Sequence, residues 1–262
     1  MVGMPAFANL PLDFGYPWWL SYGHLAILAP AVALLLFGYV RGWSQWPMTL
    51  LSVLALWSCA GFAVARLVID VNSPGTLPTQ SFLRSGTGRV LDLGAGTGRS
   101  SIMVLEARPQ TTLVALDLFA ESFDRHFGHG ASPQQRLQAN LKAAGVEQRA
   151  TIQTGDMRKL PFEGGTFDAA VSMFAVDHLR RTGITEALAE AARVVKPGGD
   201  FLLIVLAKDL WSQFAFGPLL IHSGARGPEW WSGQMKDAGF QVVEVGTPPA
   251  ALYVLAQRKW LK

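Results

Sequence analysis

The beginning of this chain has almost no charge. The sequence has 262 residues, with 22 Lys and Arg and 19 Asp and Glu, but only four charged residues lie in the first 70: Asp13, Arg41, Arg66 and Asp70. The remaining residues have nearly the charge content of an ordinary soluble domain. The chain is therefore expected to divide into an apolar region, residues 1–70, and a soluble region that begins near residue 89.

Basic clusters and cysteines are also scarce. The formal net charge is +3 and no dense run of Lys and Arg occurs, which argues against a nucleic-acid partner. Cys59 is the single cysteine, so a disulfide framework or a CxxC zinc site within one chain is excluded. No Lys or Arg precedes Arg41, whereas a secretory signal peptide has a basic start.

Two long uncharged stretches lie on either side of Arg41, and each is long enough to cross a hydrocarbon core of roughly 30 Å. We predict transmembrane helices at about 18–39 and 48–69, with tryptophans and tyrosines near their ends, as in an interfacial aromatic belt. Small residues recur every fourth position at Ala55, Cys59 and Ala63, which predicts a close-packing face within the hairpin or between hairpins of a homo-oligomer. A soluble apolar cap over the following domain is the alternative.

Residues 71–88 contain prolines and glycines and are expected to form a linker or capping loop. In residues 89–262, apolar runs alternate with helical stretches, which predicts an α/β fold with a mostly parallel, doubly wound sheet of seven strands. The last two strands are expected to form an antiparallel hairpin at one edge. The expected strands are 89–93, 112–117, 150–154, 168–173, 200–206, 240–245 and 251–256, and the expected helices are 98–107, 134–144, 182–194 and 229–238.

Glycines and carboxylates follow the first three expected strands. Gly94, Gly96 and Gly98 come after the first strand and open the first helix, where glycine allows a tight turn and close approach of a ligand. Asp117 ends the second strand, where a carboxylate can accept both hydroxyls of a ribose, and Asp156 follows the third. Ligands of such sheets bind beyond the carboxyl ends of the strands, so these residues predict a nucleotide-type site there.

Five segments in order resemble the class I S-adenosylmethionine-dependent methyltransferases, in particular the quinone and lipid methyltransferase branch with a Rossmann-like core. They are V-L-D-L-G-A-G-T-G-R, V-A-L-D, G-D-M-R-K-L-P-F, T-F-D-A-A-V-S-M-F-A-V-D-H-L and A-A-R-V-V-K-P-G-G-D-F-L-L. The resemblance covers about residues 89–257 and none of the first 70. It implies S-adenosyl-L-methionine as cofactor and methyl transfer as the activity.

The resemblance also implies roles for individual residues. Asp92 would orient the loop and help to hold the methionine amino group, and the loop backbone would lie against the cofactor. Asp117 would bind the ribose, and Asp156 with Met157 would surround the adenine, although Met157 suits simple core packing equally well. The implied cofactor-binding residues are Asp92, Gly94, Ala95, Gly96, Gly98, Asp117, Leu118, Asp156 and Met157.

Asp177 and His178 follow the fourth strand and are the candidate catalytic residues. A base is needed only if the acceptor carries a proton that must leave, and a histidine has a suitable pKa for that task in principle. The alternative is that both residues only shape the rim of the pocket. We predict no metal site, although Asp124, His126 and His129 form an unusual cluster that such a site would use.

Two related families fit the sequence less well. A dinucleotide-dependent oxidoreductase has G-x-G-x-x-G, whereas here the third glycine of G-A-G-T-G comes one position early. Arsenic methyltransferases need several cysteines, and the soluble region has none. Residues 211–231 are rich in aromatic and aliphatic side chains, which suits an apolar acceptor pocket, a patch on the bilayer or ordinary core packing.

These observations predict an integral membrane methyltransferase that modifies a lipophilic acceptor. The methyltransferase domain is expected to face the cytoplasm, where its cofactor is made, and no nucleic-acid partner is expected. A small soluble acceptor, with the hairpin only as an anchor, is the alternative. A cofactor-binding scaffold without catalysis is the third interpretation.

Overall fold

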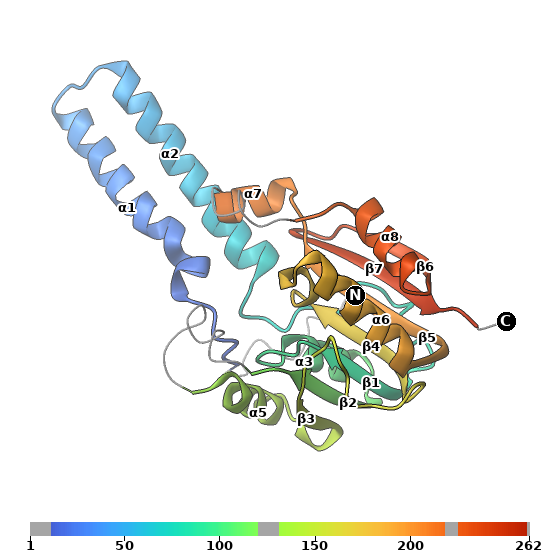
Figure 1. Ribbon diagram of the computed structural model, residues 1–262. Helices are drawn as coiled ribbons and strands as arrows, with labels where there is room; N and C mark the ends of the chain where they lie inside the picture. The colour runs from blue at the N-terminus through green and yellow to red at the C-terminus, as the bar shows by residue number, and fades with distance from the viewer. Residues whose placement is uncertain (1–11, 120–130, 218–224, 261–262) are drawn as a thin grey trace.

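The computed structural model describes residues 12–119, 131–217 and 225–260. A long helical hairpin projects from one side of an α/β domain (Figure 1). The first helix of the hairpin, α1, spans Trp18–Val40 and begins directly after Pro17. The second, α2, spans Gln45–Ala63 and continues as a π-helical segment, η1, at Val64–Ile69.

Both hairpin helices are long and apolar enough to cross a membrane, judged by length and composition alone. The small residues that pack between them differ from the expected set. Cys59 is exposed, whereas Ser58, Gly61 and Ala65 are buried. Of the expected packing face, Ala55 and Ala63 are half-buried, and the expectation is wrong for Cys59 within the hairpin. The two helices approach closely at Gly61, since a Cβ there would lie 2.3 Å from the ring of His24 on α1.

The domain contains a seven-stranded sheet with the order β3-β2-β1-β4-β5-β7-β6. The first five strands in this order are parallel to one another, while β7 is antiparallel to both β5 and β6. The expected doubly wound sheet with an antiparallel pair at one edge is confirmed. The strands are β1 (Thr87–Leu93), β2 (Gln110–Asp117), β3 (Ala150–Thr154), β4 (Phe167–Met173), β5 (Val195–Leu206), β6 (Phe240–Gly246) and β7 (Ala251–Arg258).

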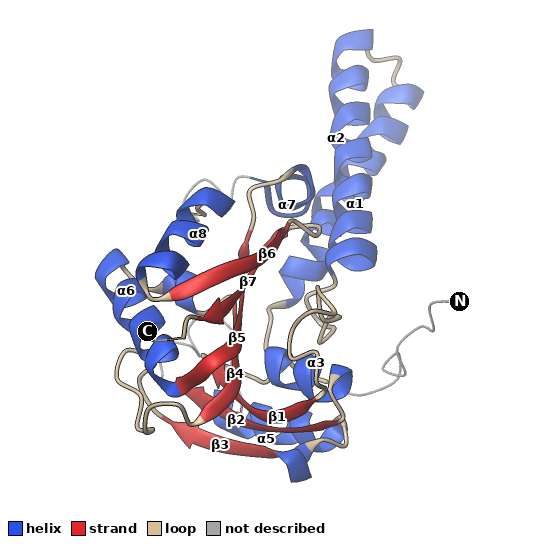
Figure 2. Ribbon diagram, turned by 90° about the vertical axis from the view of Figure 1, so that its right-hand side faces the viewer, coloured by secondary structure: helices blue, strands red, loops and turns tan. Residues whose placement is uncertain are grey.

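Helices cover both faces of this sheet (Figure 2). Successive residues of a strand point to opposite faces, so Val90 of β1 joins one apolar cluster and Leu91 joins the other. Helices α3 (Arg99–Ala107) and α5 (Pro133–Ala143) pack on the Val90 side. Helices α6 (Arg181–Val194) and α8 (Pro228–Asp237) pack on the Leu91 side.

Three short elements were not expected from the sequence: the 3₁₀ turns η2 (Glu147–Arg149) and η3 (Val176–His178), and the helix α7 (Leu210–Phe216). Helix α7 packs against α2 and η1, and both views place it beside the hairpin (Figures 1 and 2). It follows β5, so it lies at the carboxyl edge of the sheet. The hairpin therefore stands beside the edge at which ligands of such sheets bind.

Residues 71–88 pack closely on the domain. Phe82 and Leu83 are buried in the same apolar cluster as α3 and α5. The guanidinium of Arg108, at the end of α3, donates hydrogen bonds to the backbone carbonyls of Gln80, Phe82 and Leu83. The segment thus forms a fixed loop against the sheet, in keeping with a capping loop.

Candidate functional site

The glycine loop between β1 and α3 turns sharply at the carboxyl edge of the sheet. Gly94, Gly96 and Gly98 all have positive φ, at 77°, 52° and 96°, a region that glycine adopts without steric cost. The backbone N–H groups of Gly94 and Ala95 donate to the carbonyl of Leu116 at 2.8 and 3.1 Å. The loop is thereby tied to the end of β2, which carries the candidate ribose-binding acid.

Gly94 also lies against the two other segments of the rim. A Cβ at this position would be 2.4 Å from Cβ of Ala175 and 2.9 Å from Cε of Met157. The structure therefore brings the glycine loop, the segment after β3 and the segment after β4 into direct proximity, as the motif order predicts.

Asp92 lies at the centre of this edge and is fully buried. Its Oδ2 accepts hydrogen bonds from the hydroxyls of Ser100 and Ser101 at 2.7 and 2.6 Å. Its Oδ1 is buried and has no hydrogen-bond partner among the described residues. Burial raises the pKa of Asp92 to about 6, with the negative charge of Asp117 adding to the rise and the two serine hydroxyls opposing it.

Asp117 is the last residue of β2, and its carboxylate accepts hydrogen bonds from the backbone of the glycine loop and of the segment after β2. Its Oδ2 accepts from the N–H of Gly96 at 2.9 Å and its Oδ1 accepts from the N–H of Phe119 at 2.8 Å. Each carboxylate oxygen can accept a further hydrogen bond. Leu118, the next residue, is 53% exposed and presents an apolar side chain at the rim.

Asp156 is placed at the same edge but is paired with a neighbour. The guanidinium of Arg158 binds its carboxylate with both Nε and Nη2, and the shortest distance is 2.6 Å. These hydrogen bonds lower the pKa of Asp156. Met157 is half-buried and packs against the apolar cluster under α6, so its predicted alternative role in packing agrees with the structure.

Asp177 and His178 lie in η3, directly after β4. The two side chains differ in burial: Oδ1 of Asp177 is buried and has no partner among the described residues, whereas His178 is exposed. Burial raises the pKa of Asp177, and the charge of His178 partly opposes this. A buried carboxyl group whose pKa is raised holds a proton more readily than an exposed carboxylate does.

Several residues of this site were not predicted from the sequence. Ser100 and Ser101 hydrogen-bond Asp92, and Asn140 of α5 donates to the backbone carbonyl of Thr97 in the glycine loop at 2.9 Å. A signal was present for Asn140, since it is a polar residue between Leu137 and Leu141 on the apolar stripe of an expected helix. Nothing in the spacing identified its partner, which lies 43 residues away.

The residues present fit S-adenosylmethionine. The unpartnered buried oxygen of Asp92 provides an acceptor for a cationic amino group, and the Asp117 carboxylate has spare acceptor capacity for ribose hydroxyls. The contacts of individual residues with the cofactor remain predictions. No group of three or more His, Cys, Asp or Glu that could hold a metal occurs among the described residues.

Two further sequence predictions concern residues 120–130 and residues 211–231. Asp124, His126 and His129 lie in 120–130, outside the described residues. Within 211–231, Trp231 is buried in the core under α8, while Trp211 and Phe214 of α7 are 44% and 42% exposed. The segment therefore combines core packing with an exposed apolar face next to the hairpin.

Comparison with known proteins agrees with this description. Residues 90–199 match a family model described as a methyltransferase domain. The chain is 31% identical over 116 residues to the ubiquinone/menaquinone biosynthesis C-methyltransferase UbiE of Dinoroseobacter shibae, covering 44% of this chain and 41% of that protein. It is 30% identical over 138 residues to a demethylmenaquinone methyltransferase of Mycobacterium marinum, covering 52% and 50%. The chain thus matches half or less of the length of these relatives.

Similarity among solved structures extends further along the chain. An O-methyltransferase family protein from Burkholderia thailandensis superposes with a TM-score of 0.54 at 17% identity, covering 92% of this chain and 70% of that one. At that identity, the likeness supports the fold alone. Together with the family match, the glycine loop and the acids that follow β2 and β3, it establishes that this chain carries a class I S-adenosylmethionine-dependent methyltransferase domain with a Rossmann-like fold.

Proposed function

We propose that this protein is a membrane-anchored methyltransferase that transfers a methyl group from S-adenosylmethionine to a lipophilic, quinone-like acceptor. The observation that carries the proposal is the position of the apolar hairpin, which joins the domain at the carboxyl edge of the sheet. Arg99, the first residue of α3 after the glycine loop, donates to the backbone carbonyls of Asp70 and Ser73 at the end of the hairpin. A membrane that holds the hairpin would therefore lie close to the reaction site.

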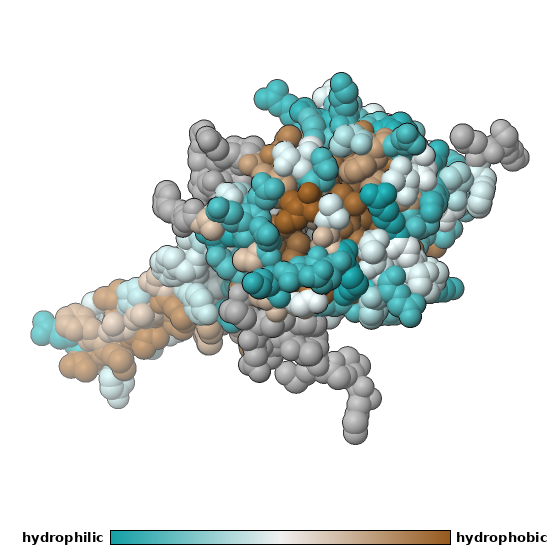
Figure 3. Space-filling view, turned by 90° about the horizontal axis from the view of Figure 1, so that it is seen from below, coloured by the Kyte–Doolittle hydropathy of each residue, from teal (hydrophilic) through white to brown (hydrophobic). Residues whose placement is uncertain are grey.

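The surface of the hairpin supports membrane insertion. Large apolar side chains of α1 and α2 are exposed, and Figure 3 shows brown and tan residues along much of this projection. The face of the domain in the same view has hydrophilic residues around a central hydrophobic patch. An exposed apolar surface of this size marks a membrane or protein interface. The most exposed large apolar side chains of the two helices are Trp18, Leu36, Tyr39, Val40, Trp46, Leu50 and Leu56.

The base of the hairpin limits how deep it can insert. His24 is buried, and its Nε2 lies 2.8 Å from the carbonyl oxygen of Ala215 in α7, so the first turns of α1 pack against protein. Residues 25–40 span only about 24 Å at 1.5 Å per residue, which is less than the roughly 30 Å of a hydrocarbon core. A full crossing therefore requires the base of the hairpin and α7 to enter the interfacial layer. Leu210, Trp211, Phe214 and Leu67 are exposed there and are suited to it.

The relatives support a quinone-like acceptor, because one is named a ubiquinone/menaquinone biosynthesis C-methyltransferase and the other a demethylmenaquinone methyltransferase. When bound, the cofactor supplies an electrophilic methyl group on a sulfonium sulfur. The chain would contribute positioning and exclusion of water, which can supply much of the rate of such a displacement. The acceptor gains the methyl group and loses a proton, and we assign the acceptance of that proton to Asp177, whose raised pKa supports the role.

The role of Asp177 can be tested with an isosteric variant. Asp177→Asn should lower kcat about 100-fold, since general-base catalysis typically contributes 10²–10⁴ in rate. The dissociation constant of S-adenosylhomocysteine should change little. Rates would be measured at several pH values, with His178→Ala as the comparison. An unchanged kcat in Asp177→Asn would contradict its role as a base, and an unchanged kcat in both variants would assign both residues to the shape of the rim.

The proposed function is tested on the purified full-length protein in detergent. The protein is incubated with methyl-labelled S-adenosylmethionine and, in separate reactions, a total membrane lipid extract or a reduced demethylmenaquinone. Products are partitioned between organic and aqueous phases, with Asp117→Ala as the inactive control.

Label in the organic phase that depends on intact Asp117 supports the proposal. Label that enters only a water-soluble product would replace the lipophilic acceptor with a soluble one. Binding of S-adenosylhomocysteine without labelling of any acceptor would favour a cofactor-binding scaffold.

A further inference from the structure

The two ends of the hairpin contact the two residues that flank Gly98 of the glycine loop. We call residues 12–16, which precede α1, the N-terminal strap, and residues 70–73, which follow η1, the exit turn. The strap contacts Thr97 and the exit turn contacts Arg99. Neither contact was expected from the sequence, which placed both segments outside the methyltransferase domain.

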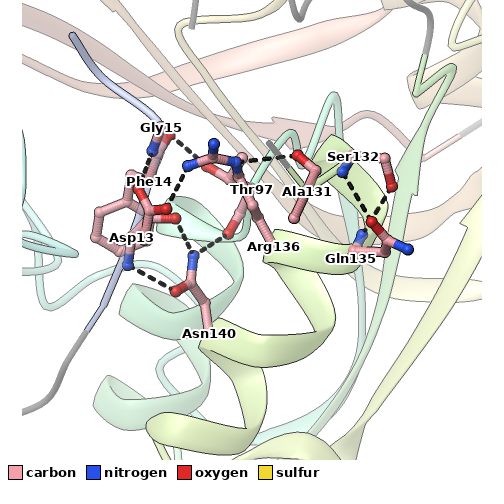
Figure 4. Close-up of polar contacts among 9 residues, drawn as sticks. All are labelled: Asp13, Phe14, Gly15, Thr97, Ala131, Ser132, Gln135, Arg136 and Asn140. Carbon is pink, nitrogen blue, oxygen red and sulfur yellow. Dashed lines mark hydrogen bonds and ion pairs between the residues drawn. The ribbon is translucent and has the colours of Figure 1, made fainter. Parts of the chain in front are cut away.

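Asn140 of α5 connects the strap to the glycine loop (Figure 4). Its Oδ1 accepts from the N–H of Asp13 at 2.9 Å, and its Nδ2 donates to the carbonyl of Asp13 at 2.9 Å and to the carbonyl of Thr97 at 2.9 Å. Both amide protons are therefore used. Asn140 is only 2% exposed, and its hydrogen bond to Thr97 is buried, while the two to Asp13 are partly buried.

The strap also contacts Thr97 directly. The Thr97 hydroxyl donates to the carbonyl oxygen of Phe14 at 3.0 Å, and the Phe14 side chain is 2% exposed within the apolar cluster of α3 and α5. Arg136 forms an ion pair with Asp13 at the surface. Exposed ion pairs contribute little, so Phe14 and Asn140 carry the attachment.

The exit turn is attached through Arg99. Its Nε donates to the carbonyl of Ser73 at 2.7 Å and its Nη2 to the carbonyl of Asp70 at 3.2 Å. Arg66, in the last turn of the hairpin, forms an ion pair with Asp70 at 2.8 Å. The end of the second hairpin helix is thus connected through the exit turn to the first residue of α3.

The glycine loop that these contacts hold is intrinsically flexible. Three glycines within five residues give the loop many conformations, and fixing glycine costs more conformational entropy than fixing other residues. Contacts that hold such a loop in its binding conformation before the ligand arrives raise affinity, because the ordering cost no longer falls on binding.

We propose that the strap and the exit turn are parts of the cofactor site. By holding Thr97 and Arg99, they keep the glycine loop in the conformation that binds S-adenosylmethionine. Release of either end therefore weakens binding of the cofactor. Thr97 and Asn140 are then positioning residues. The inference rests on the proposed function only for the identity of the cofactor. It adds that the hairpin supports cofactor binding as well as membrane attachment.

The first test measures binding of S-adenosylhomocysteine to the full-length protein in detergent by calorimetry. Thr97→Val removes the hydroxyl that donates to Phe14 and should weaken binding about fivefold to tenfold, the effect of one hydrogen bond. Thr97→Ser keeps the hydroxyl and should restore affinity to within about twofold of wild type. Asn140→Ala should weaken binding at least as much as Thr97→Val. Lys142→Ala, an exposed change on the same helix, should leave it unchanged.

A purely structural role would lower the melting temperature without separating Thr97→Val from Thr97→Ser in binding. Equal dissociation constants for wild type and Thr97→Val would overturn the inference while leaving the proposed function intact. Failure of wild type to bind S-adenosylhomocysteine would overturn both. In turnover, Thr97→Val should raise KM for the cofactor and leave kcat at saturation nearly unchanged.

A second test needs no variant. Coupling is reciprocal, so a ligand that binds the ordered loop must also stabilise the strap. Saturating S-adenosylhomocysteine should slow hydrogen exchange at the backbone amides of Asp13 and Gly15 by at least about threefold. Unchanged exchange there, with bound ligand confirmed by protection of the glycine loop, would overturn the coupling.

Discussion

Asp92 illustrates how one buried residue makes the stability of the molecule depend on pH. Its carboxyl is fully buried, and its pKa rises from 3.8 to about 6. Between these values the unfolded chain releases the proton first, so the unfolding free energy falls as the pH rises. The two serine hydroxyls reduce this cost without removing it. We predict that the second oxygen of Asp92 binds the cofactor.

The Asp92→Asn variant should lose this dependence. Relative to the variant, the wild-type unfolding free energy should fall by about 2 kcal/mol between pH 4 and pH 7. Urea unfolding in detergent at several pH values measures both proteins under the same conditions. Parallel pH profiles would show that Asp92 titrates in the folded protein as it does in the unfolded chain.

Gly94 has a more local role, which a matched pair of variants can test. Gly94→Ala combines a positive φ with a Cβ only 2.4 Å from Ala175, so the rim has to open and cofactor affinity should fall at least about tenfold. Gly145→Ala introduces the same backbone strain at φ 68° with no atom within 4 Å of the added Cβ. It should reduce stability slightly and leave the affinity for S-adenosylhomocysteine unchanged. Similar losses of affinity in both variants would contradict the close packing of the rim.

Helices and strands with a strong hydrophobic pattern were predicted well from the sequence. Elements whose position depends on contacts with distant segments were not. Strand β3 has the expected bounds, and α1 begins at the expected residue, because alternation and long apolar runs are local properties of the sequence. Helix α7 has only seven residues, and three of them are large apolar residues that remain exposed. Its position depends on α2 and η1, which the local pattern does not contain.

The hairpin offers a test of helix packing at this scale. Gly61→Ala would place a Cβ 2.3 Å from the buried ring of His24, which is held by its hydrogen bond to Ala215. It should lower the unfolding free energy by about 1–3 kcal/mol. Gly23→Ala, with the nearest atom at 3.6 Å, should be neutral. Thermal unfolding in detergent, followed by tryptophan fluorescence, compares them. An equal melting temperature for both variants would argue that His24 does not pack on Gly61 in solution.

For the whole molecule, the proposed membrane topology predicts which surfaces face each side. If both helices cross, the turn at Ser44 and the exposed surface of α8 lie on opposite sides of the membrane. In a Cys59→Ser background, Ser44→Cys and Lys236→Cys would be labelled in sealed vesicles with a membrane-impermeant maleimide. We expect only one of them to react from the outside. Labelling of both from the same side would replace the spanning hairpin with one that lies on the surface or inserts only part way.

The sequence by itself determined the two apolar helices, the alternation of strands and helices, and the glycine loop with Asp117 and Asp156 after neighbouring strands. These features depend on composition and short spacing, which a linear pattern contains. It also led to the expected fold and family.

Only the tertiary structure decided which residues support that loop. Asn140 joins Asp13 to Thr97 across separations of 127 and 43 residues, and Arg99 holds the exit turn. Hydrogen bonds and packing between distant segments depend on their positions in space. The connection between the hairpin and the glycine loop therefore exists only in the folded molecule.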